Sequence, residues 1–230
     1  MARWIGVSVS IFAFLMIGAA SASEPQPAAA NVKATQDSPA VHEDLPDETS
    51  QQLGMARQSF LTVDLGAAAT RLRKAAANLR LTSNHADEAT QPQLNRSAEE
   101  LESLSHQVES GKVKTVEELD KPSARALHRL SRHHYVMAQR SWLQKQRERT
   151  GKHLRASADN LEHAAQLGGQ ELQVASHTVV KDVRLISGKL VNGVGYGVDE
   201  VGIGLERLGK QVETVGNGIE PNHKTILRTK

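Results

Sequence analysis

Ten histidines and no cysteine limit the side-chain chemistry of this sequence. Without cysteine, thiolate metal sites, iron–sulfur clusters, disulfides and cysteine nucleophiles are excluded. The histidines lack the spacing of a helical metal site, because His-x-x-x-His does not occur and Glu-x-x-His occurs once, at Glu220 to His223, whereas a di-iron bundle needs two copies. Metal or haem binding would require several helices to bring together some of His106, His128, His134, His153 and His163. We predict no metal and no cofactor, and keep a metal- or haem-binding bundle as an alternative.

The motifs of common enzyme classes do not occur in the sequence either. There is no nucleophile elbow, phosphate-binding loop, zinc-protease helix or dinucleotide-binding fingerprint. Serines and histidines are frequent, but they follow helical stripes and no loop is placed to position them for catalysis. We therefore predict no catalytic residues and a protein that is not an enzyme.

The most specific pattern is a glycine repeat, since residues 194–221 divide into four heptads. Apolar residues fill the first and fifth positions: Val194, Val198, Val201, Leu205, Leu208, Val212, Val215 and Ile219. Their spacing of four and three is that of a coiled-coil seam. Glycine fills the second position, and Gly188 extends the column upstream: Gly188, Gly195, Gly202, Gly209 and Gly216.

Either a helix or short strands could carry this repeat. Strands would have to turn at Asp-Glu, Glu-Arg and Glu-Thr pairs, which lack the glycine or asparagine of tight hairpins. We therefore predict an amphipathic helix over 187–221. Each glycine costs about 1 kcal/mol relative to alanine in a helix, so this helix must have its seam covered. The glycines beside the seam would allow close packing by the helical body, a second copy, another protein or a lipid interface.

Charge is divided between two neighbouring segments. Residues 87–120 carry nine acidic and three basic residues, whereas residues 121–156 carry ten basic residues and one acidic residue. The overall charge of +2 thus conceals two segments of opposite net charge. We predict that they pack together with complementary flanks. The alternative is a surface for anionic envelope lipid or glycan, formed by Arg125, Arg129, Arg132, Arg140, Arg147 and Arg149.

Helical periodicity dominates the chain after residue 50. Alanine, leucine, glutamate and arginine predict helices over about 51–63, 66–82, 88–110 and 122–149, interrupted at Thr150 and Gly151. A last helix is predicted from about residue 152 into the glycine repeat. Asp64 is expected to cap a helix, Thr115 and Glu118 to form a capping box, and Pro122 to occupy a first helical position.

The N-terminus reads as an export signal. Residues 1–22 combine Arg3, an apolar stretch and the small-residue sequence Ala20-Ser21-Ala22, which predicts a signal peptide cleaved before Ser23. An uncleaved anchor is the alternative. Residues 23–50 are rich in proline, alanine and acidic residues and are expected to form a disordered linker.

The sequence thus predicts an exported all-α protein, periplasmic or extracellular. It has a helical body of bundled hairpins over 51–186, the glycine-heptad helix over 187–221 and a tail over 222–230. We expect a structural or adaptor role through protein contacts, either with itself or with an envelope partner, and no nucleic-acid partner.

Overall fold

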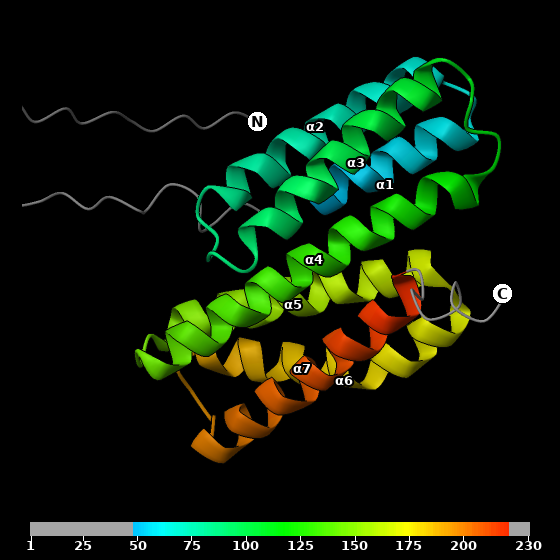
Figure 1. Cartoon of the computed structure of the whole chain (residues 1–230). Coiled ribbons are helices and arrows are strands. Elements are labelled where there is room, and N and C mark those ends of the chain that lie inside the picture. Colours follow the sequence, from blue (N-terminus) through cyan, green and yellow to red (C-terminus); the bar gives the residue numbers. More distant parts are fainter. Residues whose placement is uncertain (1–47, 221–230) are drawn as a thin grey trace, which may run out of the picture. The chain divides into compact units, whose positions relative to one another are not determined.

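A computed structural model describes residues 48–220 of the chain (Figure 1). The described residues form seven helices and no strand, which confirms the all-α prediction. The helices are α1 Glu48–Leu61, α2 Leu65–Ser83, α3 Gln91–Glu109, α4 Val116–Leu143, α5 Arg147–Gly168, α6 Gln170–Asn192 and α7 Val198–Ile219. The predicted signal peptide, most of the predicted linker and the tail lie outside the described residues. Helix α1 begins at Glu48, three residues before the predicted start of the helical body.

Side chains cap the helices at two of the predicted places. The Asp64 carboxylate accepts a hydrogen bond from the backbone N–H of Ala67 at the start of α2 (3.0 Å). Thr115 accepts one from the backbone N–H of Glu118 at the start of α4 (3.3 Å). Each bond satisfies a backbone donor that has no partner inside the helix.

Helices α1, α3 and α4 end in the same hydrogen-bonded turn. After α4, the Gln146 N–H donates to the Ser141 carbonyl and the Lys145 N–H donates to the Trp142 carbonyl. This pair of hydrogen bonds defines the Schellman motif, which places one residue in the left-handed conformation. That residue is Val63 after α1, Gly111 after α3 and Lys145 after α4, with φ of 62°, 65° and 59°.

Two predicted boundaries were wrong. Pro122 lies inside α4 rather than at its start, since the helix already begins after Thr115. The chain breaks at residues 144–146 rather than at Thr150 and Gly151, which lie in α5. Gly151 serves packing there, because a Cβ atom at this position would lie 2.9 Å from the Ser187 carbonyl oxygen of α6.

The long C-terminal helix is also not continuous. It is interrupted at Gly169, between α5 and α6, and again over residues 193–197, between α6 and α7. Gly169, Gly193 and Gly195 have φ of 124°, 74° and 65°. Residues that carry a side chain rarely adopt these backbone conformations, so the glycines allow the chain to leave the helix and turn. The seven-residue repeat therefore spans a turn as well as a helix.

Helix α4 lies between two groups of helices and contacts members of both. It packs against α1 and α3 on one side and against α5 and α7 on the other (Figure 1). The core is almost entirely leucine, alanine and valine. Its largest fully buried side chains are Leu53, Leu72, Leu79, Leu94, Leu101, Leu119, Leu127, Leu130, Leu154, Leu161, Leu190 and Leu208. Small alanines between them let the helices approach closely, which accounts for the low aromatic content.

Ion pairs connect α4 to the helices that precede it. Arg125 donates to Glu100 of α3 (3.1 Å), and Arg57 of α1 donates to Asp120 (3.0 Å). The acidic and basic segments therefore meet along part of their length, as the charge pattern predicted. Among residues 48–220, no helix is long and apolar enough to cross a membrane.

Candidate interaction surface

The apolar seam of the repeat faces the chain's own body. Val201, Leu205, Leu208, Val212 and Val215 of α7 are buried, and Ile219 is half-buried against the core. Val194 and Val198 are 65% and 68% exposed, because they lie in and just after the turn that precedes α7. Six of the eight predicted seam residues thus hold α7 on the neighbouring helices, and two do not.

Two of the five predicted close-packing glycines receive a side chain of α4. A Cβ atom at Gly216 would lie 2.6 Å from the ring of His128, and one at Gly209 would overlap the hydroxyl of Tyr135. At Gly188, Gly195 and Gly202, no described atom comes within 4 Å of the position that a Cβ would take. The close-packing interpretation therefore fails for these three within the chain, and Gly195 is needed for its positive φ instead.

Two further glycines, outside the predicted column of five, also pack closely. A Cβ atom at Gly204 would lie 2.5 Å from Ile186, and one at Gly218 would lie 2.8 Å from Leu172, both on α6. These glycines occupy the fourth position of the heptad, which the sequence shows as a second glycine column. Gly209 and Gly216 of one column therefore face α4, and Gly204 and Gly218 of the other column face α6.

His128 ties α7 to α4 through a buried hydrogen bond. Its Nε2–H donates to the Val212 carbonyl oxygen at 2.9 Å, across 84 residues of sequence. Burial lowers the pKa of His128, and the bond to Val212 opposes this only in part. The missing Cβ atom at Gly216 leaves space for the His128 ring, so this hydrogen bond depends on a glycine of the repeat.

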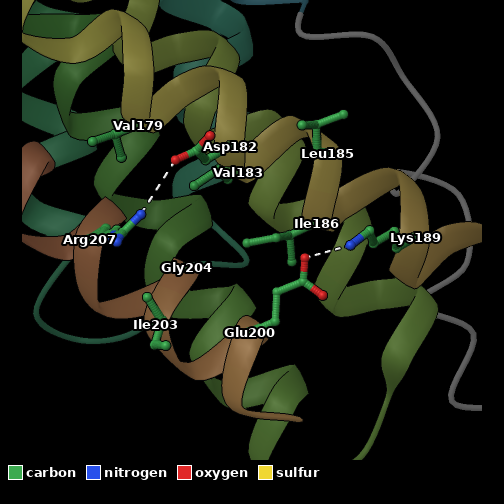
Figure 2. Close-up of a pocket in the computed structure, with 10 residues that line it drawn as sticks. All are labelled: Val179, Asp182, Val183, Leu185, Ile186, Lys189, Glu200, Ile203, Gly204 and Arg207. Carbon is green, nitrogen blue, oxygen red and sulfur yellow. Dashed lines mark hydrogen bonds and ion pairs between the residues drawn. The ribbon is translucent and has the colours of Figure 1, made fainter. Parts of the chain in front are cut away.

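On the outer side, α6 and α7 enclose a groove of about 470 Å³ (Figure 2). Apolar side chains form most of its surface, and Leu185 and Ile203 on either side are 60% and 51% exposed. The lining residues are Val179, Asp182, Val183, Leu185, Ile186, Lys189, Glu200, Ile203, Gly204 and Arg207. We call this surface the hairpin groove.

An ion pair crosses the hairpin groove at each end. Arg207 of α7 lies 3.4 Å from Asp182 of α6, and Lys189 of α6 lies 2.6 Å from Glu200 of α7 (Figure 2). The Lys189 ammonium and the Gly197 N–H both donate to Glu200, and they lower the pKa of its carboxyl group. Each end of the groove therefore carries one acidic and one basic side chain, and the two lie on opposite helices.

The predicted basic surface is divided between two environments. Arg125 and Arg129 pair with Glu100 of α3, and Arg129 also reaches Glu220 after α7 (3.1 Å). Arg132 donates to Gln93 at 3.4 Å. Near the turn between α4 and α5, Arg140 and Arg147 are exposed and Arg149 is half-buried. Arg132, Arg140 and Arg147 are the exposed members, and exposure is what the lipid or glycan alternative requires.

Three histidines meet where α4 packs on α5. The Nδ1 atoms of His134 and His153 lie 3.4 Å apart, and the rings of His133 and His134 are 5.2 Å apart. Burial is the main cause that lowers the pKa of His133 and of His153, each to about 4. Within residues 48–220, no three histidine, aspartate or glutamate side chains are placed to hold one metal ion.

The hairpin groove is thus an apolar surface that α7 leaves open to a partner, whereas the three histidines lie between α4 and α5. Comparison with known proteins does not indicate what binds in the hairpin groove. No protein-family model, curated protein or solved structure matches this chain.

Proposed function

We propose that this chain is an exported, non-enzymatic helical scaffold that self-associates through the hairpin groove. The observation that carries the proposal is the exposure of Leu185 and Ile203 beside an apolar groove with a mixed-charge rim. Large exposed apolar side chains around a groove are typical of protein interaction sites. Export is supported by the pattern of residues 1–22. Recovery of the chain from the cytoplasm alone would contradict export, whereas an envelope-derived chain that still includes residues 1–22 would identify the uncleaved anchor.

The arrangement of charges favours a second copy as the occupant. Asp182 lies opposite Arg207 at one end, and Lys189 lies opposite Glu200 at the other. Consider two copies placed face to face about a two-fold axis along the groove. Each α6 then faces the partner's α7 at the same end, and every acid meets a base.

The perpendicular two-fold axis gives the same result. In that arrangement each α6 faces the partner's α6 with the ends exchanged, so Asp182 meets Lys189 and Arg207 meets Glu200. A two-fold interface requires such self-complementarity, because the same patch is used by both subunits. The open Gly202 beside Ile203 also lets a partner backbone come close to the groove.

Sedimentation velocity over a range of concentrations tests the proposal. We expect a concentration-dependent dimer for the unchanged chain and a monomer for Ile203→Glu, because a buried unpaired carboxylate opposes association. The matched control is Val174→Glu, which places the same charge at an exposed α6 position outside the groove. Circular dichroism checks that both variants are folded.

Three results would contradict self-association through this surface. One is an unchanged chain that stays monomeric up to high micromolar concentration. A second is dimerisation of Ile203→Glu as strong as that of the unchanged chain. The third is equal loss of the dimer in Val174→Glu.

A further inference from the structure

Two turns meet at one end of the described helices. The turn between α4 and α5 and the turn between α6 and α7 lie close together (Figure 1). A Cβ atom at Gly193 would lie 2.7 Å from Cζ of Arg147, so the Arg147 side chain covers the second turn. Residues far apart in sequence therefore form one surface at this end.

This surface exposes apolar side chains at its tips. Leu143, the last residue of α4, is 82% exposed, and Val194 follows directly after Gly193 on the other turn. Trp142 beside Leu143 is half-buried and packs against the core. Leu143 and Val194 project from turns rather than lining a groove, so a protein partner would need a deep pocket to cover both.

Basic side chains lie near these apolar tips. Arg140, Lys145 and Arg147 are exposed, whereas their counterparts Arg125 and Arg129 nearer the start of α4 are paired with α3. The acidic residues nearby are Glu148, Asp199 and Glu200. Glu148 pairs with Lys152 (3.2 Å) and Glu200 with Lys189, which leaves the basic residues in excess.

We propose that this end of the molecule binds the surface of an anionic bilayer. We call it the basic corner, formed by Arg140, Leu143, Lys145, Arg147 and Val194. Leu143 and Val194 enter the headgroup region, while the three basic side chains contact lipid phosphates. Exposed apolar side chains beside basic ones are typical of interfacial binding, which depends on apolar burial and on attraction to anionic lipid together. Few apolar residues take part, so binding is shallow and reversible.

Trp142 makes this proposal directly measurable. The sequence has two tryptophans, and Trp4 lies in the predicted signal peptide. A chain that begins at Ser23 keeps all described residues and has Trp142 as its single tryptophan. Its fluorescence then reports on the basic corner alone during titration with vesicles. We use phosphatidylcholine vesicles with and without phosphatidylglycerol.

We expect the fluorescence of Trp142 to change with the anionic vesicles only, and the change to weaken as salt is raised. Neutralising Arg140, Lys145 and Arg147 to glutamine should weaken binding roughly fivefold per charge. The control neutralises Lys74, Lys121 and Lys181, which are exposed elsewhere, to glutamine. Changing Leu143 and Val194 to serine should also weaken binding, whereas the exposed Leu81→Ser should not.

Several outcomes would overturn the proposal. The first is equal binding to neutral vesicles. The second is an equal loss in the lysine control. The third is unchanged binding of the Leu143 and Val194 double variant together with loss in the charge variant, which identifies a site for soluble polyanions instead. Sedimentation with vesicles repeats each comparison without fluorescence, and circular dichroism confirms that the variants are folded.

Discussion

At the scale of single residues, the helix ends show how strongly one backbone angle constrains the choice of side chain. Val63, Gly111 and Lys145 occupy the same position of the same turn with φ near 60°. Only glycine adopts this conformation freely, and a β-branched residue such as valine is the least suited to it. Val63 is exposed, so no packing compensates for its strained backbone.

Exchanging glycine and valine between two of these turns measures the strain. Val63→Gly should raise the free energy of unfolding by roughly 0.5–1 kcal/mol, since the left-handed penalty of valine exceeds the entropy that glycine loses on folding. Gly111→Val should lower it by about 1 kcal/mol or more. Nothing lies within 4 Å of a Cβ at Gly111, so that loss reflects the backbone alone. Chemical denaturation checks both, and no gain in Val63→Gly would contradict this explanation.

At the scale of elements, α7 shows what a glycine repeat does for a helix with little propensity of its own. Its seam residues bury it on the neighbouring helices, while two glycine columns let α4 and α6 side chains reach its backbone. The sequence predicted six of the eight seam residues on the packed face, because a period of 3.5 fixes which side chains share a face, and the two others, Val194 and Val198, are exposed. It did not show which glycine meets which side chain, since that depends on neighbours far away in the sequence.

A pair of alanine substitutions in α7 separates packing from helix propensity. Gly202→Ala should stabilise the chain by roughly 0.5–1 kcal/mol, because its Cβ meets open space and alanine favours the helix. Gly216→Ala should destabilise it by about 1–3 kcal/mol, because the Cβ would displace His128 from Val212. Chemical denaturation at low protein concentration compares the two. Equal effects of both substitutions would show that His128 does not depend on Gly216.

The helix boundaries show where the sequence was informative. Asp64 and Thr115 mark helix starts by a side-chain capping chemistry that is local and therefore readable. The end of α4 depends on Lys145 in a left-handed conformation, which the residue type does not indicate. Similarly, the turn at Gly193 and Gly195 lies within a seven-residue repeat that continues across it, so periodicity alone extended the helix too far.

At the scale of the whole molecule, α4 connects both groups of helices and also carries the enclosed histidines. The ring of His134 on α4 stacks on that of His153 on α5, and His133 lies beside His134. Asp87, in the loop before α3, partly opposes the lowering of the pKa of His133. The arginines Arg140 and Arg149 lie near enough to disfavour added positive charge. Burial also lowers the pKa of His134 well below its ordinary value. The sequence could not identify this cluster, because adjacent histidines point to different sides of a helix.

This cluster should make the fold sensitive to acid. A histidine whose pKa falls from 6.5 to about 4 on folding stabilises the chain fully above pH 6.5, and this contribution is lost as pH drops toward 4. We expect the free energy of unfolding to fall through this range, by at most about 1.4 kcal/mol per pH unit for each such histidine. Chemical denaturation at a series of pH values measures the slope.

Matched substitutions assign the slope to its source. His133→Gln and His153→Gln should each flatten the dependence between pH 6.5 and 4.5, above the range where most carboxyl groups titrate. His177→Gln, at an exposed position of α6, serves as the control. A slope that survives both cluster substitutions would place the acid sensitivity elsewhere.

The bond between His128 and Val212 also has a consequence for the order in which the chain folds. It joins residues 84 positions apart, whereas α1 to α3 and α4 to α6 form hairpins between consecutive helices. Nucleating α7 alone is unfavourable because of its glycines, so it must condense onto a surface that α4, α5 and α6 have already built. Unfolding follows the opposite order, so α7 is the first helix to detach. The native chain therefore passes most easily into a short-lived form in which its C-terminal helix is melted and the rest remains folded.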